Sequence, residues 1–429
     1  MTKAPPLRDD CFIMPRGVVW TPVDEALDRL RMSLESALAS SEVSVKNAFG
    51  RILAHDVRAI VNHPPFMNSA VDGYGFAFDT LPIGDELALP LLDGRSAAGQ
   101  PYSGKVPAGY AIRILTGAAV PLGVDTIILE EDVNNTKTHI HFLRGLKQNA
   151  NTRPMGEDIL SGSIILYKGR KLRPADLGVL ASGGIARVKV YNKLRVAVLT
   201  TGDELVEVGS IAQNSQIVDA NRPMLLAQIK KWGYIPVDLG IVVDNTILIE
   251  EALNQAAKSA DIILTTGGVS AGDEDHISKL LVQKADLQTW RIALKPGRPL
   301  ALAFWDNVPV LGLPGNPVAA MVCTHVFAYP ACSFLSGQGW LEPFSVKVVA
   351  AFSKNKKIGR QEYLRARLNT DGHAEVFKSE GSGRISGLSW SDGLVVLSHD
   401  AQQVNQGDMV KYLSLIHISE PTRLLSISY

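Results

Sequence analysis

The sequence has few cysteines, no net charge and no long apolar run, and each shortage argues against a class of protein. Three of its 429 residues are cysteine (Cys11, Cys323 and Cys332), and they form no CxxC pair. We therefore expect reduced thiols in a cytoplasmic protein, with neither disulfides nor a zinc site. Lysine plus arginine and aspartate plus glutamate both number 43, which argues against a broad basic surface for nucleic acid. No apolar run is long enough to cross a bilayer, and the first ten residues lack the apolar core of a signal peptide, so no membrane association is expected.

The length and the remaining composition are those of a globular protein with several domains. At roughly 150 residues per domain, 429 residues make about three. Hydrophobic residues make up 46% and charged residues 20%, which is typical of folded cores. The end of the chain is an exception. LSLIHISEPTRLLSISY follows a plausible end near Tyr412 and resembles a translated sequencing adapter, so residues from about 414 to 429 are expected not to contribute to the fold.

The first 190 residues predict a helix followed by a domain of strands. Thr21 can cap the helix, Pro22 suits its first turn, and apolar residues then recur every three or four positions as far as about Ala39. Between about 60 and 155 the apolar runs are short and broken by glycine and proline, as in ELALPLL and DTIILEEDV, which predicts an inserted β domain. A strand-like run and a short helix over 174–181 follow.

Residues 193–335 alternate between strand and helix patterns. RVAVLTT, YIPVDLGIV and DIILTT are apolar enough for buried strands, and helices are expected over 221–232, 245–260 and 276–285. Such a βαβ series predicts a parallel sheet with helices on both faces, and ligands of such sheets bind beyond the carboxyl ends of the strands. Residues 340–413 contain short apolar runs such as FSVKVVAAF and YLRARL and predict a small all-β domain.

Glycine turns at the predicted strand ends indicate an anion-binding site. Gly267 and Gly268 end a strand just before a helix, where free N–H groups and the helix dipole attract anions. Such a turn by itself is more often only a tight chain reversal. Lys295 and Arg298 add positive charge in a further glycine turn, so a ligand with a phosphate group is the better explanation.

Acidic residues follow the same strand ends, where they would repel a phosphate. Asp203 and Glu204 follow one strand, and residues 273–275 add three more carboxylates. Solvated acids are common in loops, but carboxylates that converge on a phosphate site are explained if Mg²⁺ lies between them. We therefore predict that some of these acids bind Mg²⁺.

A set of motifs spread over residues 10–412 resembles the MoeA family of molybdopterin molybdenumtransferases, which includes the E domain of gephyrin. The motifs are NSAVDGY (68–74), RILTGAAVP (113–121), MGEDI (155–159), TTGDEL (200–205), DANR (219–222), TTGGVSAGDED (265–275), LKPGRP (294–299) and GLPGNPV (312–318). No single motif is specific, but the ordered set is highly specific.

The resemblance implies an activity, a fold and partners. Members of the family take adenylylated molybdopterin and molybdate, cleave the pyrophosphate link with Mg²⁺, release AMP and leave molybdenum on the dithiolene. The fold is α/β plus β, an elongated multidomain homodimer whose active site lies in a cleft between the two subunits. A transient contact with the molybdopterin adenylyltransferase that supplies the substrate is also expected. The implied domains are a discontinuous helical and strand linker (12–60 and 159–192), an inserted β domain (61–158), an α/β molybdopterin-binding domain with the βαβ parallel sheet (193–336) and a C-terminal β barrel (340–413).

The resemblance also implies roles for individual residues. Asp72 and Thr116 match positions that face the cleft, and Glu204 and Asp275 match acids required for activity, so all four are predicted to be catalytic. Glu204 and Asp275 are in addition the predicted metal ligands. The residues predicted to bind substrate are Arg153, Asp158, Asp219, Asn221, Arg222, Gly267, Gly268, Ser270, Lys295, Arg298, Pro314, Gly315, Asn316, Arg360, Arg365 and Ser382.

The chain departs from the usual family pattern at three positions. Val71 stands where methionine is common, and Ala319 stands where a serine commonly follows the GLPGNPV turn. Arg298 replaces a common lysine, which keeps the charge but changes the geometry of the donors. We therefore expect Arg298 to contact a phosphate, but the sequence does not predict the geometry of that contact.

Several alternatives remain open from the sequence. Asp72 could simply stabilise the Asp-Gly turn of its motif, and His139 and His141 share one face of a strand that is more often exposed than metal-binding. The chain could be a molybdopterin adenylyltransferase, but the inserted and terminal β regions argue against that. It could be a non-catalytic scaffold, but a scaffold need not keep Asp72, Glu204 and Asp275 together. Molybdate and tungstate are not distinguished.

Overall fold

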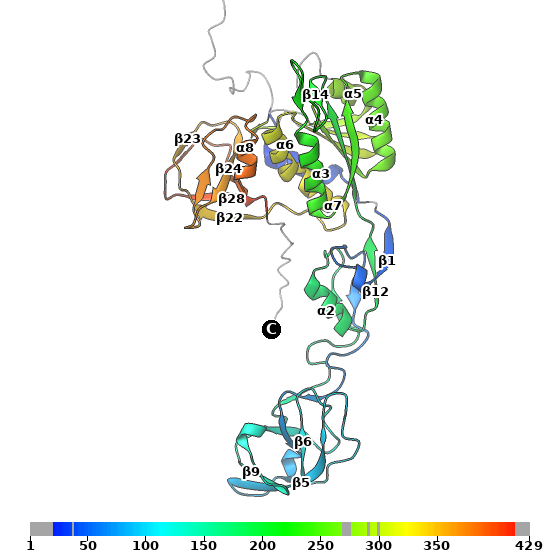
Figure 1. The fold of residues 1–429 in the computed structure, drawn as a ribbon, viewed down its shortest axis with the longest axis vertical. Coiled ribbons are helices and arrows are strands. Elements are labelled where there is room, and N and C mark those ends of the chain that lie inside the picture. Colours follow the sequence, from blue (N-terminus) through cyan, green and yellow to red (C-terminus); the bar gives the residue numbers. More distant parts are fainter. Residues whose placement is uncertain (1–19, 37, 268–275, 290–291, 298–300, 417–429) are drawn as a thin grey trace, which may run out of the picture. The chain divides into compact units, whose positions relative to one another are not determined.

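The computed structural model describes residues 20–36, 38–267, 276–289, 292–297 and 301–416. The contacts within the chain divide it into two compact units (Figure 1). The first unit consists of residues 1–41 and 191–429, and the second of residues 42–190. The second unit is therefore an insertion between two parts of the first.

The first unit is built on a six-stranded sheet in the order β16-β13-β17-β21-β20-β18 (Figure 1). Its strands are β13 (Arg195–Thr201), β16 (Ile235–Val242), β17 (Ile262–Thr266), β18 (Asp286–Thr289), β20 (Ala301–Trp305) and β21 (Val308–Leu313). β16, β13, β17 and β21 are parallel, as predicted, whereas β20 runs antiparallel to both of its neighbours, β21 and β18. The antiparallel part arises because Asp306 and Asn307, with φ of 48° and 64°, form a two-residue hairpin between β20 and β21.

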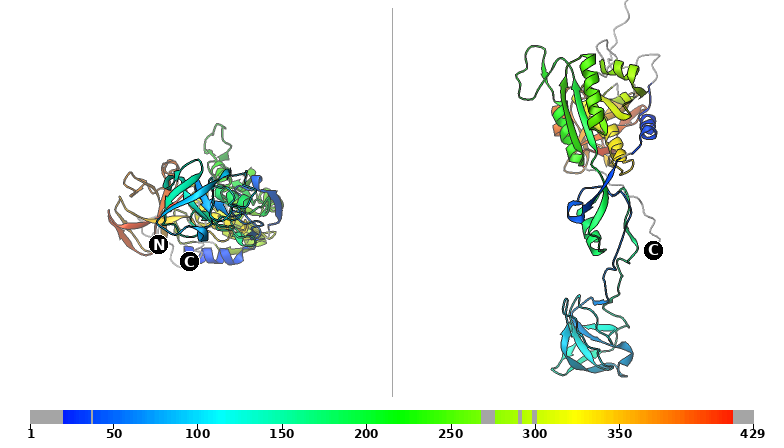
Figure 2. Two further views of the ribbon diagram at one scale, coloured as in Figure 1. Left: turned by 90° about the horizontal axis from the view of Figure 1, so that it is seen from below. Right: turned by 90° about the vertical axis from the view of Figure 1, so that its right-hand side faces the viewer.

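Helices cover both faces of this sheet, which confirms the prediction. Alternate residues of a strand point to opposite faces, and in β13 Val198 belongs to the core under α3 whereas Leu199 belongs to the core under α4 and α5. Two further views show the sheet and its helices (Figure 2). α3 stops at Gly233, which has the left-handed φ of 92° and confirms the predicted end. The helices are α3 (Asn221–Trp232), α4 (Thr246–Ser259) and α5 (His276–Lys284).

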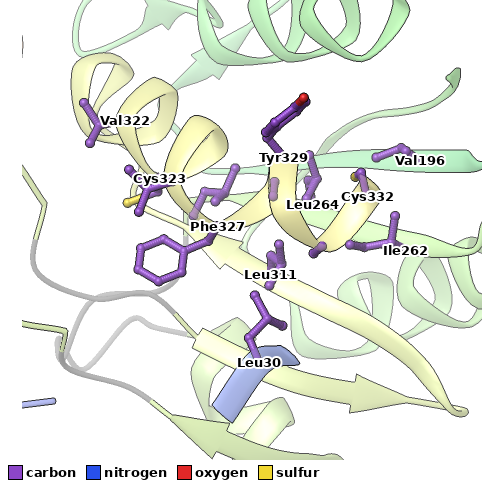
Figure 3. Packing of buried hydrophobic residues seen from close by; sticks show 14 of the residues in the cluster. Leu30, Val196, Ile262, Leu264, Leu311, Val322, Cys323, Phe327, Tyr329 and Cys332 are labelled. Atoms are coloured by element: carbon purple, nitrogen blue, oxygen red, sulfur yellow. The ribbon is translucent and has the colours of Figure 1, made fainter. Parts of the chain in front are cut away.

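A continuous helical segment from Pro317 to Leu335 lies in the core under α3 (Figure 3). It consists of α6 (Pro317–Cys323), the π-helical turn η4 (Thr324–Ala328) and α7 (Tyr329–Leu335). The sequence analysis did not predict this helix and expected no apolar run of this length. By length and composition alone the segment could cross a membrane, but 89% of it is buried inside the unit, so it serves as a core helix. Pro330 is tolerated because it stands in the first turn of α7.

The helix predicted near the N-terminus is present but shorter than expected. α1 spans Val23–Ser33, and Pro22, not Thr21, takes the capping position. Thr21 instead extends the backbone pairing, because its carbonyl accepts a hydrogen bond of 2.8 Å from the amide of Ala293. Leu34 is buried as the apolar pattern predicts, but its backbone is already extended, so the apolar spacing continued beyond the helix.

The C-terminal part of the first unit forms an open sheet in the order β19-β24-β26-β28-β22, with β25 paired to β24. Its strands and its helix are β19 (Leu294–Lys295), β22 (Ser345–Val349), β24 (Gln361–Leu368), β25 (Ala374–Val376), α8 (Ser386–Trp390), β26 (Gly393–Leu397) and β28 (Met409–Ser414). The small pairs β14 (Leu205–Val206) with β15 (Ile217–Val218) and β23 (Lys354–Lys356) with β27 (Gln402–Val404) complete the unit. Because β19 lies beside β24, Lys295 is placed next to Glu362.

The natural fold extends slightly further than the sequence analysis expected. Ser414 is the last residue of β28 and is buried, and the amide of Leu415 donates a hydrogen bond of 2.9 Å to the carbonyl of Asp392. Ser414 therefore belongs to β28, and Leu415 is bonded beside it, so the ordered pairing reaches slightly beyond Tyr412. Residues 417–429 lie outside the described part of the chain.

The second unit contains a six-stranded sheet in the order β7-β4-β6-β5-β9-β8 and several two-stranded pairs, as the short apolar runs predict (Figure 1). The sheet strands are β4 (Gly73–Phe76), β5 (Glu86–Ser96), β6 (Ala111–Ile114), β7 (Thr126–Leu129), β8 (Asn134–Asn135) and β9 (His139–Leu143). The pairs are β1 (Ser40–Ser44) with β12 (Arg187–Tyr191), β2 (Val57–Arg58) with β11 (Ile164–Leu166), and β3 (Asn68–Ser69) with β10 (Thr152–Arg153). The helices are η1 (Val45–Asn47), η2 (Phe78–Thr80), η3 (Glu130–Asp132) and α2 (Pro174–Ser182). His139 and His141 are exposed on β9.

Candidate active site at the carboxyl ends of the strands

The ends of the parallel strands β13 and β17 meet closely because Gly267 has no side chain between them. Gly267, directly after β17, has φ of 87°, and a Cβ there would lie 2.1 Å from the carbonyl oxygen of Thr201 at the end of β13. A Cβ on Gly315, after β21, would meet the Cα of Gly267 at 3.6 Å. Any larger residue at 267 would push β13 and β17 apart. The predicted glycine turn is therefore a point of close backbone approach, as anion-binding turns require.

Asn221 and Asp219 fix the loops around these strand ends. The Asn221 amide group donates hydrogen bonds of 2.7 Å to the carbonyl of Gly315 and 3.1 Å to the hydroxyl of Thr266. Asp219 is buried and accepts the backbone N–H groups of Asn221 and Arg222 at 3.0 and 3.1 Å. The DANR motif thus joins the start of α3 to the ends of β17 and β21. Both residues position the site through backbone groups.

Several buried polar atoms at this edge have no hydrogen-bond partner among the described residues. They are the hydroxyls of Thr200, Thr201 and Thr265 and one side-chain oxygen each of Asp219, Asn221 and Asp244. Buried polar groups are almost always paired with protein or with ordered solvent or ligand. These unpartnered atoms lie at the carboxyl ends of the parallel strands, which is where ligands of such sheets bind.

Asp203, Glu204 and Asp244 are three acidic residues that influence one another at the same edge. The Glu204 carboxylate lies over Gly202, since a Cβ there would be 2.6 Å from its Oε2, and Asp203 accepts the N–H of Asp244 at 2.9 Å. Burial and the negative charges of Asp203 and Glu204 raise the pKa of Asp244. Asp244 stands two residues after β16, so its position near a strand end is a signal that could have identified it, but it was not among the predicted residues.

This donor set suits a hard cation such as Mg²⁺. Oxygen ligands from one or two carboxylates are what Mg²⁺ prefers, and Asp244 Oδ1 is buried with no partner in the described ranges. A cation would also remove the repulsion that raises the pKa of Asp244. Among the described residues no three His, Cys, Asp or Glu side chains are already gathered around one point. Asp275, the second predicted ligand, lies outside the described residues.

Arg222, predicted to bind substrate, is held by acidic side chains of the protein itself. It forms ion pairs with Glu207, with Asp238 at 3.1 Å and with Asp219 at 3.8 Å. The side chain is only 14% exposed, so these charges are poorly screened by water. In this structure Arg222 links the start of α3 to β16 and to the segment after β14.

Lys295 is also paired with carboxylates. Its ammonium group lies 2.8 Å from Glu380 and 3.3 Å from Glu362, and Lys354 is paired with the same two glutamates. Burial disfavours the charge of Lys295, but the hydrogen bonds and charges of Glu380 and Glu362 outweigh it and raise its pKa. A cavity of about 160 Å³ adjoins the cluster and is lined by Lys295, Lys354 and Glu380 among others. The predicted phosphate-binding lysine therefore already carries two counter-ions.

The remaining predicted residues of this unit lie near the same strand ends but differ in what they contact. Asn316, which follows Pro314 and Gly315, caps α6 by accepting the N–H of Val318, and the carbonyl of Ser382 approaches that N–H at 3.4 Å. Arg360 is half-buried just before β24. Arg365 is buried and donates to the carbonyls of Ser379, Gly381 and Arg384, so it orders the loop around Ser382. Gly268, Ser270 and Arg298 lie outside the described residues.

In the second unit, Asp72 and Thr116 are directly bonded to each other. Asp72 Oδ1 accepts both the hydroxyl and the backbone N–H of Thr116 at 2.6 Å, and these hydrogen bonds lower the pKa of Asp72. The Asp72 carboxylate therefore does more than stabilise its Asp-Gly turn. Arg153 is exposed on β10, which pairs with β3 three residues before Asp72, and Asp158 is exposed five residues further along.

Comparison with known families agrees with this arrangement. Residues 21–184 match the MoeA N-terminal region (domain I and II), residues 197–333 match the probable molybdopterin binding domain, and residues 347–415 match the MoeA C-terminal region (domain IV). A molybdopterin molybdenumtransferase of Haemophilus influenzae is 36% identical over 402 residues, 92% of this chain and 99% of that protein. The chain belongs to the MoeA family.

Other members of the MoeA family give the same result for sequence and fold. A molybdopterin molybdenumtransferase of a Nostoc species is 33% identical over 406 residues, which are 89% of this chain and 90% of that protein. The crystal structure of the molybdopterin biosynthesis MoeA protein of Pyrococcus horikoshii superimposes with a TM-score of 0.81 at 28% identity, covering 92% of this chain and all of that one. The fold is thus MoeA-like, a mixed α/β architecture with several sheets.

Proposed function

We propose that this chain is a molybdopterin molybdenumtransferase, which uses Mg²⁺ to cleave adenylylated molybdopterin, releases AMP and transfers molybdate to the pterin. Membership in the MoeA family and the names of its relatives support the proposal. The observation that carries it is the edge formed by Gly267 and Gly315, where unpartnered buried oxygens meet the carboxylates of Asp203, Glu204 and Asp244. A site with bare backbone and converging acids suits a phosphoester held together with a divalent cation.

Each group at this edge has a distinct task in the proposed reaction. Asp203, Glu204 and Asp244 would hold Mg²⁺, which when bound supplies positive charge to the pyrophosphate oxygens. The backbone around Gly267 would bind phosphate oxygens, and Asn221 keeps that backbone in place through Gly315 and Thr266. Catalysis would then be mainly positional and electrostatic.

Further parts of the expectation belong to the same proposal. Asp72, Thr116, Arg153 and Asp158 would act on the same substrate, as would Asp275 with the other candidates outside the described residues. We also propose a cytoplasmic homodimer with the four-domain layout given above, including the C-terminal barrel. Transient contact with a molybdopterin adenylyltransferase would supply the substrate. These statements draw on membership in the family.

The product identifies the reaction. The protein is mixed with adenylylated molybdopterin, Mg²⁺ and molybdate, and the pterin is analysed by mass spectrometry while AMP is quantified. Molybdenum-bearing pterin and an equal amount of AMP are expected. Intact substrate would contradict the proposal, and consumption of ATP in a parallel reaction with molybdopterin would indicate an adenylyltransferase. Replacing molybdate by tungstate tests the preference between the two oxyanions.

A further inference from the structure

Glu380 bridges two lysines in the way an oxyanion would. Its Oε2 lies 2.8 Å from the ammonium group of Lys295, and its other carboxylate oxygen is bonded to Lys354. The two ammonium groups therefore share one carboxylate. These hydrogen bonds and charges outweigh burial and lower the pKa of Glu380, which keeps it ionised at neutral pH.

The second carboxylate of the cluster is fixed, whereas Glu380 can leave. Glu362 lies on β24 between β19 and β26, and its side chain is only 12% exposed. Glu380 stands on the segment between β25 and α8, and its side chain is 47% exposed. A half-exposed side chain on a connecting segment has room to rotate into solvent when another anion takes its place on the lysines. Glu362 has no such path within its strand.

The backbone on each side of Glu380 is held, so that motion would be confined to its side chain. Arg365 is buried and donates hydrogen bonds to the carbonyls of Ser379 and Gly381, the two neighbours of Glu380. The same guanidinium lies 4.9 Å from the centre of the Phe377 ring. Arg365 thus pins the backbone that presents Glu380 to Lys295 and Lys354.

Glu380 also lines the cavity of about 160 Å³ beside the two lysines. Lys295, Lys354, Lys378 and Arg365 are among the other lining residues, so positive groups outnumber Glu380 there. Rotation of the Glu380 side chain would expose the ammonium groups of Lys295 and Lys354 to this cavity. A small tetrahedral oxyanion could then replace the carboxylate with hydrogen bonds of the same kind.

We propose that Glu380 is a displaceable counter-ion that competes with an oxyanion for Lys295 and Lys354, so that only anions carrying more than one negative charge bind there. A singly charged ligand would merely exchange one negative charge for another, whereas a doubly charged one gains additional attraction, because Coulomb energy scales with charge. The ligand class is a dianionic tetrahedral oxyanion. Its assignment to molybdate or to a phosphate group of the substrate rests on the proposed function.

The test compares the wild-type protein with Glu380→Gln, which keeps the shape and removes the charge. Binding of molybdate, inorganic phosphate and the singly charged perrhenate is measured by equilibrium dialysis without pterin. Loss of the competing carboxylate is expected to tighten molybdate or phosphate binding by about tenfold and to make perrhenate binding measurable. The dianion that the wild-type protein binds more tightly identifies the source of the natural ligand.

Salt dependence separates a counter-ion from a structural role. In Glu380→Gln, Lys295 and Lys354 carry one more uncompensated positive charge than in the wild type. The oxyanion affinity of the variant should therefore fall more steeply with added potassium chloride than that of the wild type. Glu375→Gln is the matched control, because it removes a glutamate paired with Arg367 on the same sheet. The control should bind all three anions as the wild type does, and thermal unfolding checks that both variants are folded.

The outcomes also distinguish this inference from the proposed function. The counter-ion role is overturned if a folded Glu380→Gln variant binds oxyanions no more tightly than the wild type does, or if neither protein binds them. This holds even if the wild type releases AMP in the presence of molybdate. Tighter binding by the variant supports the role, and it does so also if the wild type proves inactive on adenylylated molybdopterin.

Discussion

Two aspartates, one in each unit, have pKa values shifted in opposite directions. Asp72 is exposed and accepts two hydrogen bonds from Thr116, which lower its pKa. Asp244 is partly buried beside Asp203 and Glu204, and burial together with their charges raises its pKa. The first carboxylate is satisfied by the protein, whereas the second is destabilised by it. Under the proposed function, Asp72 would already have its working geometry, whereas Asp244 would be completed by a cation.

Each unit has a glycine that closely approaches a neighbouring backbone near its candidate residues, and replacing that glycine is expected to have the largest effect. A Cβ at Gly73 would lie 1.8 Å from the carbonyl oxygen of Ile128, and one at Gly267 would lie 2.1 Å from that of Thr201. Gly73→Ala and Gly267→Ala should each lower the free energy of unfolding by at least about 2 kcal/mol, because strands must separate. Urea denaturation measures the change.

Gly315→Ala is the matched control for these two variants. A Cβ at position 315 meets nothing closer than 3.6 Å, so its stability should stay within about 1 kcal/mol of the wild type. Equal destabilisation of all three variants would mean that close approach does not define the two sites.

Asp244→Asn should remove Mg²⁺ dependence without harming the fold. Loss of one carboxylate from a metal site, or of a group that orients it, typically lowers metal affinity or activity by about 10- to 100-fold. We expect a decrease of that size in Mg²⁺-dependent AMP release, measured over a Mg²⁺ titration. Glu251→Gln, an exposed acid on α4, serves as control. AMP release equal to that of the wild type at every Mg²⁺ concentration would exclude Asp244 from the metal site.

Thr116→Val tests whether Asp72 works in the geometry that Thr116 imposes. The substitution removes the hydroxyl donor but keeps the backbone N–H, so AMP release should fall by less than about tenfold while the fold is unchanged. The pKa of Asp72, followed by NMR, should rise toward its ordinary value. Thr152→Val, which removes a hydroxyl bonded to the carbonyl of Asn149 on the neighbouring β10, should change neither quantity.

The dependence of stability on pH should have opposite sign for the two aspartates. The folded pKa of Asp72 is lowered, so its stabilisation is present above the unfolded value of 3.8 and is lost as the pH falls through the folded pKa. The folded pKa of Asp244 is raised, so its stabilisation is present below 3.8 and is lost as the pH rises through the folded pKa.

Without Mg²⁺ at pH 7, Asp72→Asn should therefore lower the melting temperature and Asp244→Asn should raise it, each by no more than about 2 °C. Both differences should shrink as the pH is lowered toward 3. Scanning calorimetry measures them. Shifts of the same sign in the two variants would contradict the comparison, and saturating Mg²⁺ should abolish the gain in Asp244→Asn.

Patterns local to the chain were sufficient for much of the fold and for part of the site. Apolar runs identified β13, β16 and β17, and Gly233 marked the end of α3. Motif matches predicted that Asp72 and Thr116 are both catalytic residues, and in the structure the two side chains are hydrogen-bonded to each other. These features could be predicted because each depends on the spacing of apolar residues within a short segment or on the order of motifs along the chain.

Other features could not be read from local patterns. Lys295 was assigned to ligand binding from its charge and its motif, and Arg365 from the family resemblance. The structure pairs Lys295 with Glu380, 85 residues away, and Arg365 with backbone carbonyls. The helix from Pro317 to Leu335 was missed because its residues are apolar on all sides and so give no periodic signal.

By itself, the sequence determined the class of elements, the glycine turns after the strands and membership in the MoeA family, because periodicity, backbone freedom and motif order are properties of short segments. Only the tertiary structure decided which charges are already compensated. Ion pairs such as Glu380 with Lys295, and repulsion such as that on Asp244, arise from residues that become neighbours only when distant segments pack together. Electrostatic energy depends on those distances and on burial.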